Sequence, residues 1–174
     1  GLDYGEGLGK GAKAIGFKTY EPNPVDDFKP DYTNPISIPD ASVDKITSLN
    51  VLNVVKKEDR DNAVKDIFRI LKVDGEAIIT TRGSDIYGDK AKPAVANIGN
   101  EAGSVITSSG TFQKGFTQPE LEAYVQDLLG DSVTITKFKG GKAGIKITKV
   151  KPEVDRKTPY NKITEEELDS FYAD

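Results

Sequence analysis

Residues 45–81 alternate between strand-like and helix-like hydrophobic patterns, and this constrains the fold more than any other feature of the chain. Residues 45–49 are nearly all apolar or small, as in a buried parallel strand. Residues 57–72 place four apolar side chains on one helical face, before a glycine that ends the segment. These side chains are Val64, Ile67, Phe68 and Leu71, and the glycine is Gly75. Residues 76–81 form a second buried strand, so the region predicts a doubly wound parallel sheet of the α/β class.

Three glycines at alternate positions follow an acidic residue at the start of the chain. The acid is Asp3 and the glycines are Gly5, Gly7 and Gly9. Glycine accepts positive φ and lets a ligand approach the main chain, and a following helix, expected over residues 10–15, directs its free N–H groups toward that ligand. The pattern predicts a strand-to-helix turn around a nucleotide. The competing interpretation is a flexible glycine-rich leader.

Three kinds of nucleotide site compete for this loop. A phosphate-binding P-loop is excluded, because Lys10 is followed by Gly11 instead of Ser or Thr. A dinucleotide fingerprint fits residues 7–12 with alanine in the last position. The third pattern is an acidic residue followed by glycines at alternate positions. The loop alone does not decide between the last two.

Glu21 comes directly after a short strand predicted over residues 17–20. A carboxylate at the tip of a second parallel strand can accept hydrogen bonds from both ribose hydroxyls of a nucleotide. The alternative is a solvated acid in a turn before Pro22. Together with the glycine loop, the ribose role is the better interpretation.

Two segments predict loops. Residues 22–35 carry four of the nine prolines of the chain, and residues 82–116 are polar and rich in glycine. A loop as long as the second is usually functional or disordered. Phe112 and Phe116 near its end provide either an aromatic wall for a substrate or anchors that fix the loop to the core.

The last part of the domain predicts a helix and a hairpin. A capping box at 117–120 opens a helix that runs to residue 129, and residues 132–138 and 144–150 alternate around a Gly-Gly turn. The composition then becomes charged, which indicates a linker followed by a short helix. We therefore expect one domain over residues 1–150, with a linker and C-terminal helix over residues 151–174.

Several stretches resemble class I S-adenosylmethionine-dependent methyltransferases. Residues 38–44, 49–52 and 66–75 look like the middle of such a domain, from its adenine-contacting loop through its fourth strand to an RxLKPGG-like turn. The chain departs from this pattern at residues 73–74, where Pro-Gly is usual. The acidic-x-Gly-x-Gly-x-Gly spacing from Asp3 resembles the family's first motif. The resemblance covers about residues 1–150 and outweighs the dinucleotide interpretation, which has no such downstream support.

The resemblance implies a fold, a cofactor and a set of binding residues. The fold would be a doubly wound, mostly parallel Rossmann-like sheet with an antiparallel edge hairpin, and the cofactor S-adenosyl-L-methionine. Within the family, the chain looks most like methyltransferase-type domains of phages and mobile elements, some of them inside large multi-domain proteins. The stretches that carry this closer likeness are residues 3–5, 20–22, 49–55 and 112–117.

Binding roles carry over by motif from the resembled family. The three glycines of the loop would form the turn under the amino-acid moiety of the cofactor, with Asp3 near it. Glu21 would hold the ribose. Ile36 and Ile38 would sandwich the adenine, and Asn50 would lie at the tip of the fourth strand, where the acceptor meets the methyl group.

Composition excludes several function classes. The 174 residues contain no histidine and no cysteine, which excludes Ser-His-Asp and Cys-His catalysis, disulfides and the commonest zinc ligands. A net charge of −4 provides no general basic field for nucleic acid, although a local patch is compatible with it. No apolar run approaches the roughly 20 residues of a membrane span. We therefore expect a cytoplasmic protein without membrane contact, located in the host cytoplasm or the virion if it is phage-encoded.

The methyl acceptor stays open among nucleic acid, protein and small molecule. Cytosine-C5 methylation requires a cysteine nucleophile, and there is none. Adenine-N6 enzymes usually carry Asn/Asp-Pro-Pro-aromatic at the fourth strand tip, where this chain has Leu49-Asn50-Val51-Leu52. The candidates for a catalytic base are Tyr4, Asp85, Tyr87 and Lys114, each better explained as structural.

The glycine loop begins after very few residues, whereas the strand leading into it needs roughly five. We therefore expect a truncated first strand and a piece of a longer protein, with other domains as further partners. The alternative function is a catalytically inactive, methyltransferase-like structural or interaction module.

Overall fold

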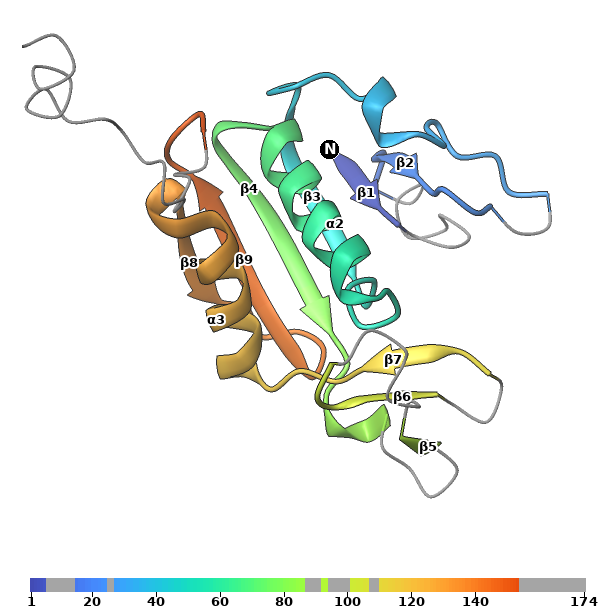
Figure 1. The fold of residues 1–174 in the computed structure, drawn as a ribbon. Helices are drawn as coiled ribbons and strands as arrows, with labels where there is room; N and C mark the ends of the chain where they lie inside the picture. The colour runs from blue at the N-terminus through green and yellow to red at the C-terminus, as the bar shows by residue number, and fades with distance from the viewer. Residues whose placement is uncertain (6–14, 25–26, 87–91, 94–100, 107–109, 154–174) are drawn as a thin grey trace, which may run out of the picture.

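A computed structural model describes residues 1–5, 15–24, 27–86, 92–93, 101–106 and 110–153 (Figure 1). Gly7, Gly9, most of the helix expected over 10–15 and the predicted C-terminal helix lie outside these residues. The strands are β1 (Leu2–Tyr4), β2 (Lys18–Tyr20), β3 (Val43–Leu49), β4 (Leu71–Thr81), β5 (Lys92–Pro93), β6 (Ser104–Ile106), β7 (Phe112–Lys114), β8 (Val133–Lys137) and β9 (Ala143–Lys149). The helices are α2 (Lys57–Ile70) and α3 (Gln118–Leu129), with short 3-10 turns η1 (Pro35–Ser37), η2 (Ser84–Ile86) and η3 (Gly130–Ser132).

The main sheet has six strands in the order β2-β1-β3-β4-β9-β8. β2, β1, β3 and β4 are parallel to their neighbours, whereas β9 pairs antiparallel with β4 and β8 antiparallel with β9. This mostly parallel sheet with an antiparallel edge hairpin confirms the predicted Rossmann-like α/β class. No helix in the described part of the chain is long and apolar enough to cross a membrane.

Helices α2 and α3 contact each other and cover the same face of this sheet (Figure 1). The face of α2 that Val64, Ile67 and Phe68 form is buried, as the periodicity predicts. Alternate strand residues such as Ile79 and Ile147 are also fully buried and join the same core. The opposite face carries Lys45, Glu76 and other polar side chains with partial or full exposure.

The connection from α2 to β4 differs from the sequence prediction. We expected the helix to continue to residue 72, but it ends at Ile70, and β4 begins directly with Leu71 paired to Val43. The next pair is Lys45 with Glu76, so residues 72–75 are looped out of the ladder. Asp74 has φ +70° there, which places the predicted turn inside the strand.

Residues 82–116 contain more regular structure than a loop. β5, β6 and β7 form a separate antiparallel sheet beyond the carboxyl end of β4 (Figure 1). The expectation of a long loop was wrong here because these strands have only two or three residues each, too few to generate a readable alternation.

The helix and hairpin predicted after residue 116 are confirmed. The Thr117 side chain accepts a hydrogen bond from the Glu120 N–H and caps α3, and Gly130 ends it with φ +58°. Gln118 then ties the helix to the hairpin, because its side chain donates to Gly144 O (2.6 Å) and accepts from Gly144 N (2.9 Å).

Candidate functional site

The carboxyl ends of β1, β2 and β3 meet at one edge of the sheet, because these strands are parallel and adjacent. Three predicted binding residues follow these strands directly: Gly5 after β1, Glu21 after β2, and Asn50 after β3. Asp3 lies within β1 itself. The fold therefore brings these four residues to one edge, where open α/β sheets bind ligands.

Asp3 is held in place from the neighbouring strand. Its side chain is on the sheet face opposite α2, and Asp3 is only 3% exposed. The Thr47 hydroxyl donates to Asp3 Oδ1 at 2.8 Å, and the two residues are direct register partners. A buried carboxylate fixed in this way orients β1 relative to β3 just below the edge.

Gly5 makes the sharp turn at the end of β1. Its φ is +84°, its N–H donates to Tyr20 O at 2.8 Å, and an added Cβ would lie 2.8 Å from Val51 Cγ1. A side chain at this position would be strained and would collide with the loop that follows β3. The predicted need for glycine is therefore met here. Gly7 and Gly9 lie outside the described residues.

Glu21 is half-buried at the tip of β2, as predicted. Its N–H donates to Tyr32 O at 3.1 Å, and its Oε1 accepts from the Asn23 N–H at 3.0 Å. One carboxylate oxygen thus stabilises the turn, as in the turn-acid interpretation, and the ribose role stays a prediction. A parallel bridge between Tyr20 and Tyr32 extends the sheet by one residue beyond β2.

Asn50 adopts a left-handed conformation, with φ +58°, directly after β3. Its N–H donates to both Thr80 O (2.9 Å) and Thr80 Oγ1 (3.2 Å), which fixes its backbone against β4. Asparagine tolerates this conformation better than most residues. The residue is exposed, and it lies at the tip of the strand, as predicted.

Ile36 and Ile38 do not join the other predicted residues. Arg69, in the last turn of α2, donates to Pro35 O (2.9 Å) and Ile38 O (2.7 Å). Leu71 follows α2 directly and pairs with Val43, the first residue of β3. The end of α2, and with it the segment that Arg69 binds, therefore lies at the amino edge of the sheet. Ile38 is 1% exposed within the core, and Ile36 is 84% exposed. Their placement gives no support to the predicted adenine contact.

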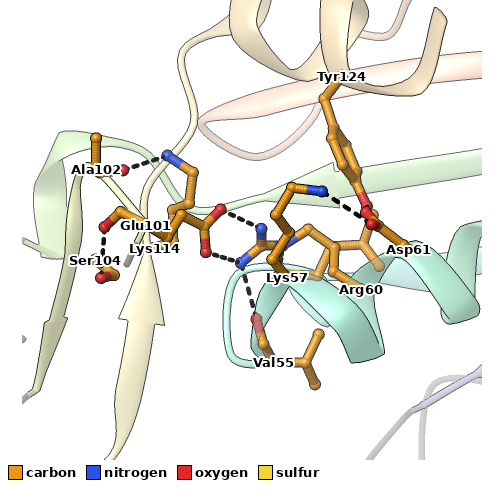
Figure 2. A network of polar contacts seen from close by, with 10 residues as sticks. Val55, Lys57, Arg60, Asp61, Glu101, Ala102, Ser104, Lys114 and Tyr124 are labelled. Carbon is orange, nitrogen blue, oxygen red and sulfur yellow. Dashed lines mark hydrogen bonds and ion pairs between the residues drawn. The ribbon is translucent and has the colours of Figure 1, made fainter. Parts of the chain in front are cut away.

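A buried arginine network lies beside the site and was not predicted from the sequence. Arg60 is 1% exposed; its Nε donates to Leu52 O (2.9 Å) and its Nη2 to Val55 O (2.8 Å). Both carbonyls belong to the loop that follows Asn50, and Figure 2 shows the bond to Val55. The one available signal is position: Arg60 precedes Val64 and Ile67 by four and seven residues, so a charged residue lies on the apolar stripe of α2.

The same guanidinium forms a two-pronged ion pair with Glu101, which precedes β6 (Figure 2). Its central carbon lies 5.1 Å from the Phe116 ring centroid and 5.9 Å from that of Tyr124. Phe116 is 3% exposed, so it anchors its segment to the core, while Phe112 is half-buried in β7. Arg60 therefore connects the loop after β3 to the small sheet.

None of the described base candidates is free at the site. Tyr4 faces α2, where its hydroxyl donates to Asp66 (3.3 Å); burial, with the Asp66 charge, raises the Tyr4 pKa far above its usual value. Desolvation raises the pKa of Asp85, but hydrogen bonds from Arg82 and the Gly83 N–H outweigh it, so the net pKa is lowered. Lys114 donates to Ala102 O at 3.0 Å. Tyr87 lies outside the described residues.

Among the described residues, no group of three His, Cys, Asp or Glu side chains could hold a metal ion.

Comparison with known proteins finds a family match over the strands that form this edge of the sheet. Residues 2–79 match a family model described as a methyltransferase domain. That segment contains β1 to β3, α2 and most of β4. A search of the curated proteins found no match.

Solved structures share the fold at low sequence identity. The PH0226 protein from Pyrococcus horikoshii OT3 superposes with a TM-score of 0.62 at 14% identity, covering 85% of this chain and 80% of its own. A SAM-dependent methyltransferase from Methanosarcina mazei gives 0.56 at 19% identity, with 84% and 89% covered. The 1,6-didemethyltoxoflavin-N1-methyltransferase of Burkholderia thailandensis, solved with S-adenosylhomocysteine and 1,6-didemethyltoxoflavin, gives 0.55 at 15% identity, with 87% and 71% covered.

Proposed function

We propose that this chain, which has the fold of S-adenosylmethionine-dependent methyltransferases, binds S-adenosylmethionine at the carboxyl edge of β1–β3 and transfers its methyl group to an acceptor. The family match over residues 2–79 and the methyltransferase neighbours support this cofactor. The observation that carries the proposal is the convergence of Asp3, Gly5, Glu21 and Asn50 on one edge of the sheet.

The residues present at this edge fit the cofactor. Glu21 supplies a half-buried carboxylate, which suits the two ribose hydroxyls, because each carboxylate oxygen accepts a hydrogen bond. Gly5 makes the turn after β1 at a positive φ that a side chain would strain, and Gly7 and Gly9 follow it in the sequence. Asp3 would complete the amino-acid end of the site.

When bound, the cofactor supplies an electrophilic methyl group on a sulfonium. The task of the protein is then to hold donor and acceptor close and aligned. Asn50 offers a carboxamide donor and acceptor where the two meet, and Arg60 fixes the loop behind it through Leu52 and Val55. Because the chain has no histidine or cysteine, an acceptor that keeps a free lone pair suits this site best.

The proposal extends to a phage- or mobile-element-encoded domain of a larger protein. Its support is the sequence resemblance over residues 3–5, 20–22, 49–55 and 112–117. Sequencing the region around the coding gene tests it: phage structural or mobility genes on both sides support the extension, and unrelated chromosomal neighbours overturn it.

Calorimetric titration with S-adenosylmethionine and S-adenosylhomocysteine tests the main proposal, with Gly5→Ala and Gly16→Ala as a matched pair. Both glycines have positive φ, but an added Cβ meets Val51 at Gly5 and nothing within 4 Å at Gly16. We expect micromolar binding by the wild type and Gly16→Ala, and binding lost in Gly5→Ala. Absence of binding by a folded wild type would favour the inactive structural module instead.

A further inference from the structure

The β8–β9 hairpin differs in charge from the rest of the chain. Residues 132–151 contain six lysines and no acidic residue. The chain has 24 basic and 28 acidic residues, so the remainder carries 18 against 28, a formal net charge of −10. A single basic segment on an acidic domain concentrates positive potential at one place.

The tip of this hairpin, residues 137–142, borders the proposed acceptor position. Gly141 has φ +67°, and a Cβ added there would lie 3.2 Å from Thr80 Cβ. Thr80 is the residue that accepts both hydrogen bonds from the Asn50 N–H. Thr80 therefore lies beside the tip and is bonded to Asn50, and Figure 1 shows the hairpin loop beside the carboxyl end of β4.

Three lysines of the tip are available for a ligand. Lys137, Lys139 and Lys142 are exposed, and none of them forms an ion pair with another described residue. The other hairpin lysines are engaged: Lys146 with Glu76, Lys151 with Asp131, and Lys149 with buried carbonyls. Asp85 lies near this tip, but Arg82 already binds its carboxylate.

Phe138 presents an aromatic ring among these lysines. A Cβ added at Gly144 would lie 3.2 Å from Phe138 Cδ1, and the ring also packs against Gly140. The side chain nevertheless remains 38% exposed. One part of the ring is thus supported by glycine backbone and the rest faces solvent, as in a stacking platform for a base.

We propose that the 137–142 tip binds single-stranded nucleic acid as the methyl acceptor, with phosphates at Lys137, Lys139 and Lys142 and a base stacked on Phe138. This inference rests on the proposed function, since it names the substrate of that site. Cations and an exposed aromatic ring together match an unpaired strand better than an acidic peptide, which has charge without bases. In the transfer the acceptor lone pair forms the new bond to carbon as the sulfur–methyl bond breaks, leaving S-adenosylhomocysteine and a proton released to water.

Fluorescence anisotropy with a labelled mixed-sequence 20-nucleotide RNA and the same DNA, at several KCl concentrations, tests this inference. Lys139→Gln/Lys142→Gln should weaken binding at least tenfold and reduce the slope of log affinity against log salt by about 1.4, two phosphate contacts on a single strand. The control is Lys65→Gln/Lys72→Gln, which changes two exposed lysines outside the hairpin. It should leave the affinity and the salt slope unchanged. Phe138→Leu keeps an apolar side chain on the glycines and should weaken binding roughly fivefold or more without changing the slope.

The outcomes separate this inference from the proposed function, because the same samples are titrated with S-adenosylmethionine. Cofactor binding without oligonucleotide binding overturns the inference and leaves the function standing. Oligonucleotide binding without cofactor binding overturns the acceptor role together with the function. Equal losses in the two lysine pairs, or complete displacement of the oligonucleotide by equimolar polyglutamate, also overturn it.

Discussion

At each end of α2, a buried cation donates hydrogen bonds to main-chain carbonyls, but the two cations hold different parts of the molecule. At the first turn, Arg60 donates to the carbonyls of Leu52 and Val55. At the last turn, Lys149 from β9 donates to Phe68 O (2.9 Å) and Leu71 O (2.7 Å). Both cations are at most 3% exposed, and both stack on a phenylalanine ring. In each case a buried cation replaces water on main-chain carbonyls.

The difference lies in what each cation holds. Lys149 binds carbonyls at the C-terminal end of α2, so it fastens the helix to the sheet and complements the helix dipole. Arg60 also binds Glu101, 41 residues away, and so joins α2 to the loop after Asn50 and to the small sheet. The Lys149 contacts at the amino edge therefore fasten the helix, and the Arg60 contacts at the carboxyl edge also fix the segments around the proposed site.

Removing Arg60 is expected to have the largest effect. Arg60→Met should lower the free energy of unfolding by about 3–5 kcal/mol, since it leaves Glu101, with its side chain 12% exposed, without its partner. Urea unfolding measures this. The double variant Arg60→Met/Glu101→Met should recover part of the loss, because no buried charge is left unpaired. A double variant as unstable as the sum of its single variants would contradict a coupled pair.

Lys149→Met should cost less, about 1–3 kcal/mol, because it leaves carbonyls unsatisfied but also removes a buried ammonium group. Hydrogen exchange sharpens the comparison. The amides of Asn50 and Lys114, which donate to Thr80 O and Asn53 O, should lose protection in Arg60→Met and keep it in Lys149→Met. Equal loss in both variants would mean that the two ends of α2 are not functionally distinct.

Alkaline pH should affect the two ends in opposite directions. Burial, with a hydrogen bond to Asp61 in the first turn of α2, raises the pKa of Tyr124 above 10.0, so above pH 10 only the unfolded state loses this proton and stability falls. Burial lowers the pKa of Lys149 below 10.5, so as pH rises toward 10.5 the folded state loses its proton first and stability rises. The test measures the unfolding free energy of the wild type minus that of each variant, between pH 8 and 11. This difference should fall with pH for Tyr124→Phe and rise with pH for Lys149→Met. Slopes of the same sign would refute one of these assignments.

Local features of the fold could be predicted from the sequence, whereas long-range polar contacts could not. Strands, helix faces and the edge hairpin were predictable, because periodicity and caps such as Thr117 are local signals. The edge that gathers Asp3, Gly5, Glu21 and Asn50 was also predictable, because each of the last three directly follows a strand. The partners of Arg60 were not, since they come from segments 5 to 41 residues distant.

Ile36 and Ile38 mark the limit of motif reasoning. The resemblance placed them near the adenine of the cofactor, but Arg69 binds the carbonyls of Ile38 and Pro35, 31 and 34 residues away, at the C-terminal end of α2. Next to β2, the described residues form only a single-residue bridge, between Tyr20 and Tyr32. Long-range contacts of a polar side chain leave no periodic trace in a sequence.

The smallest expected effect comes from an exposed ion pair at the amino edge. Arg69 Nη1 lies 2.6 Å from Asp40 Oδ1, but the Asp40 side chain is 77% exposed, so water screens the pair. Asp40→Asn should therefore cost only about 0.2–1 kcal/mol, and the cost should shrink further in 1 M salt. Glu101→Gln is the counterpart at the carboxyl edge; its loss should be larger and nearly independent of salt, because Arg60 is buried. Urea unfolding of both variants at low and high salt decides the point, since equal costs would mean that burial does not distinguish the two ends of α2.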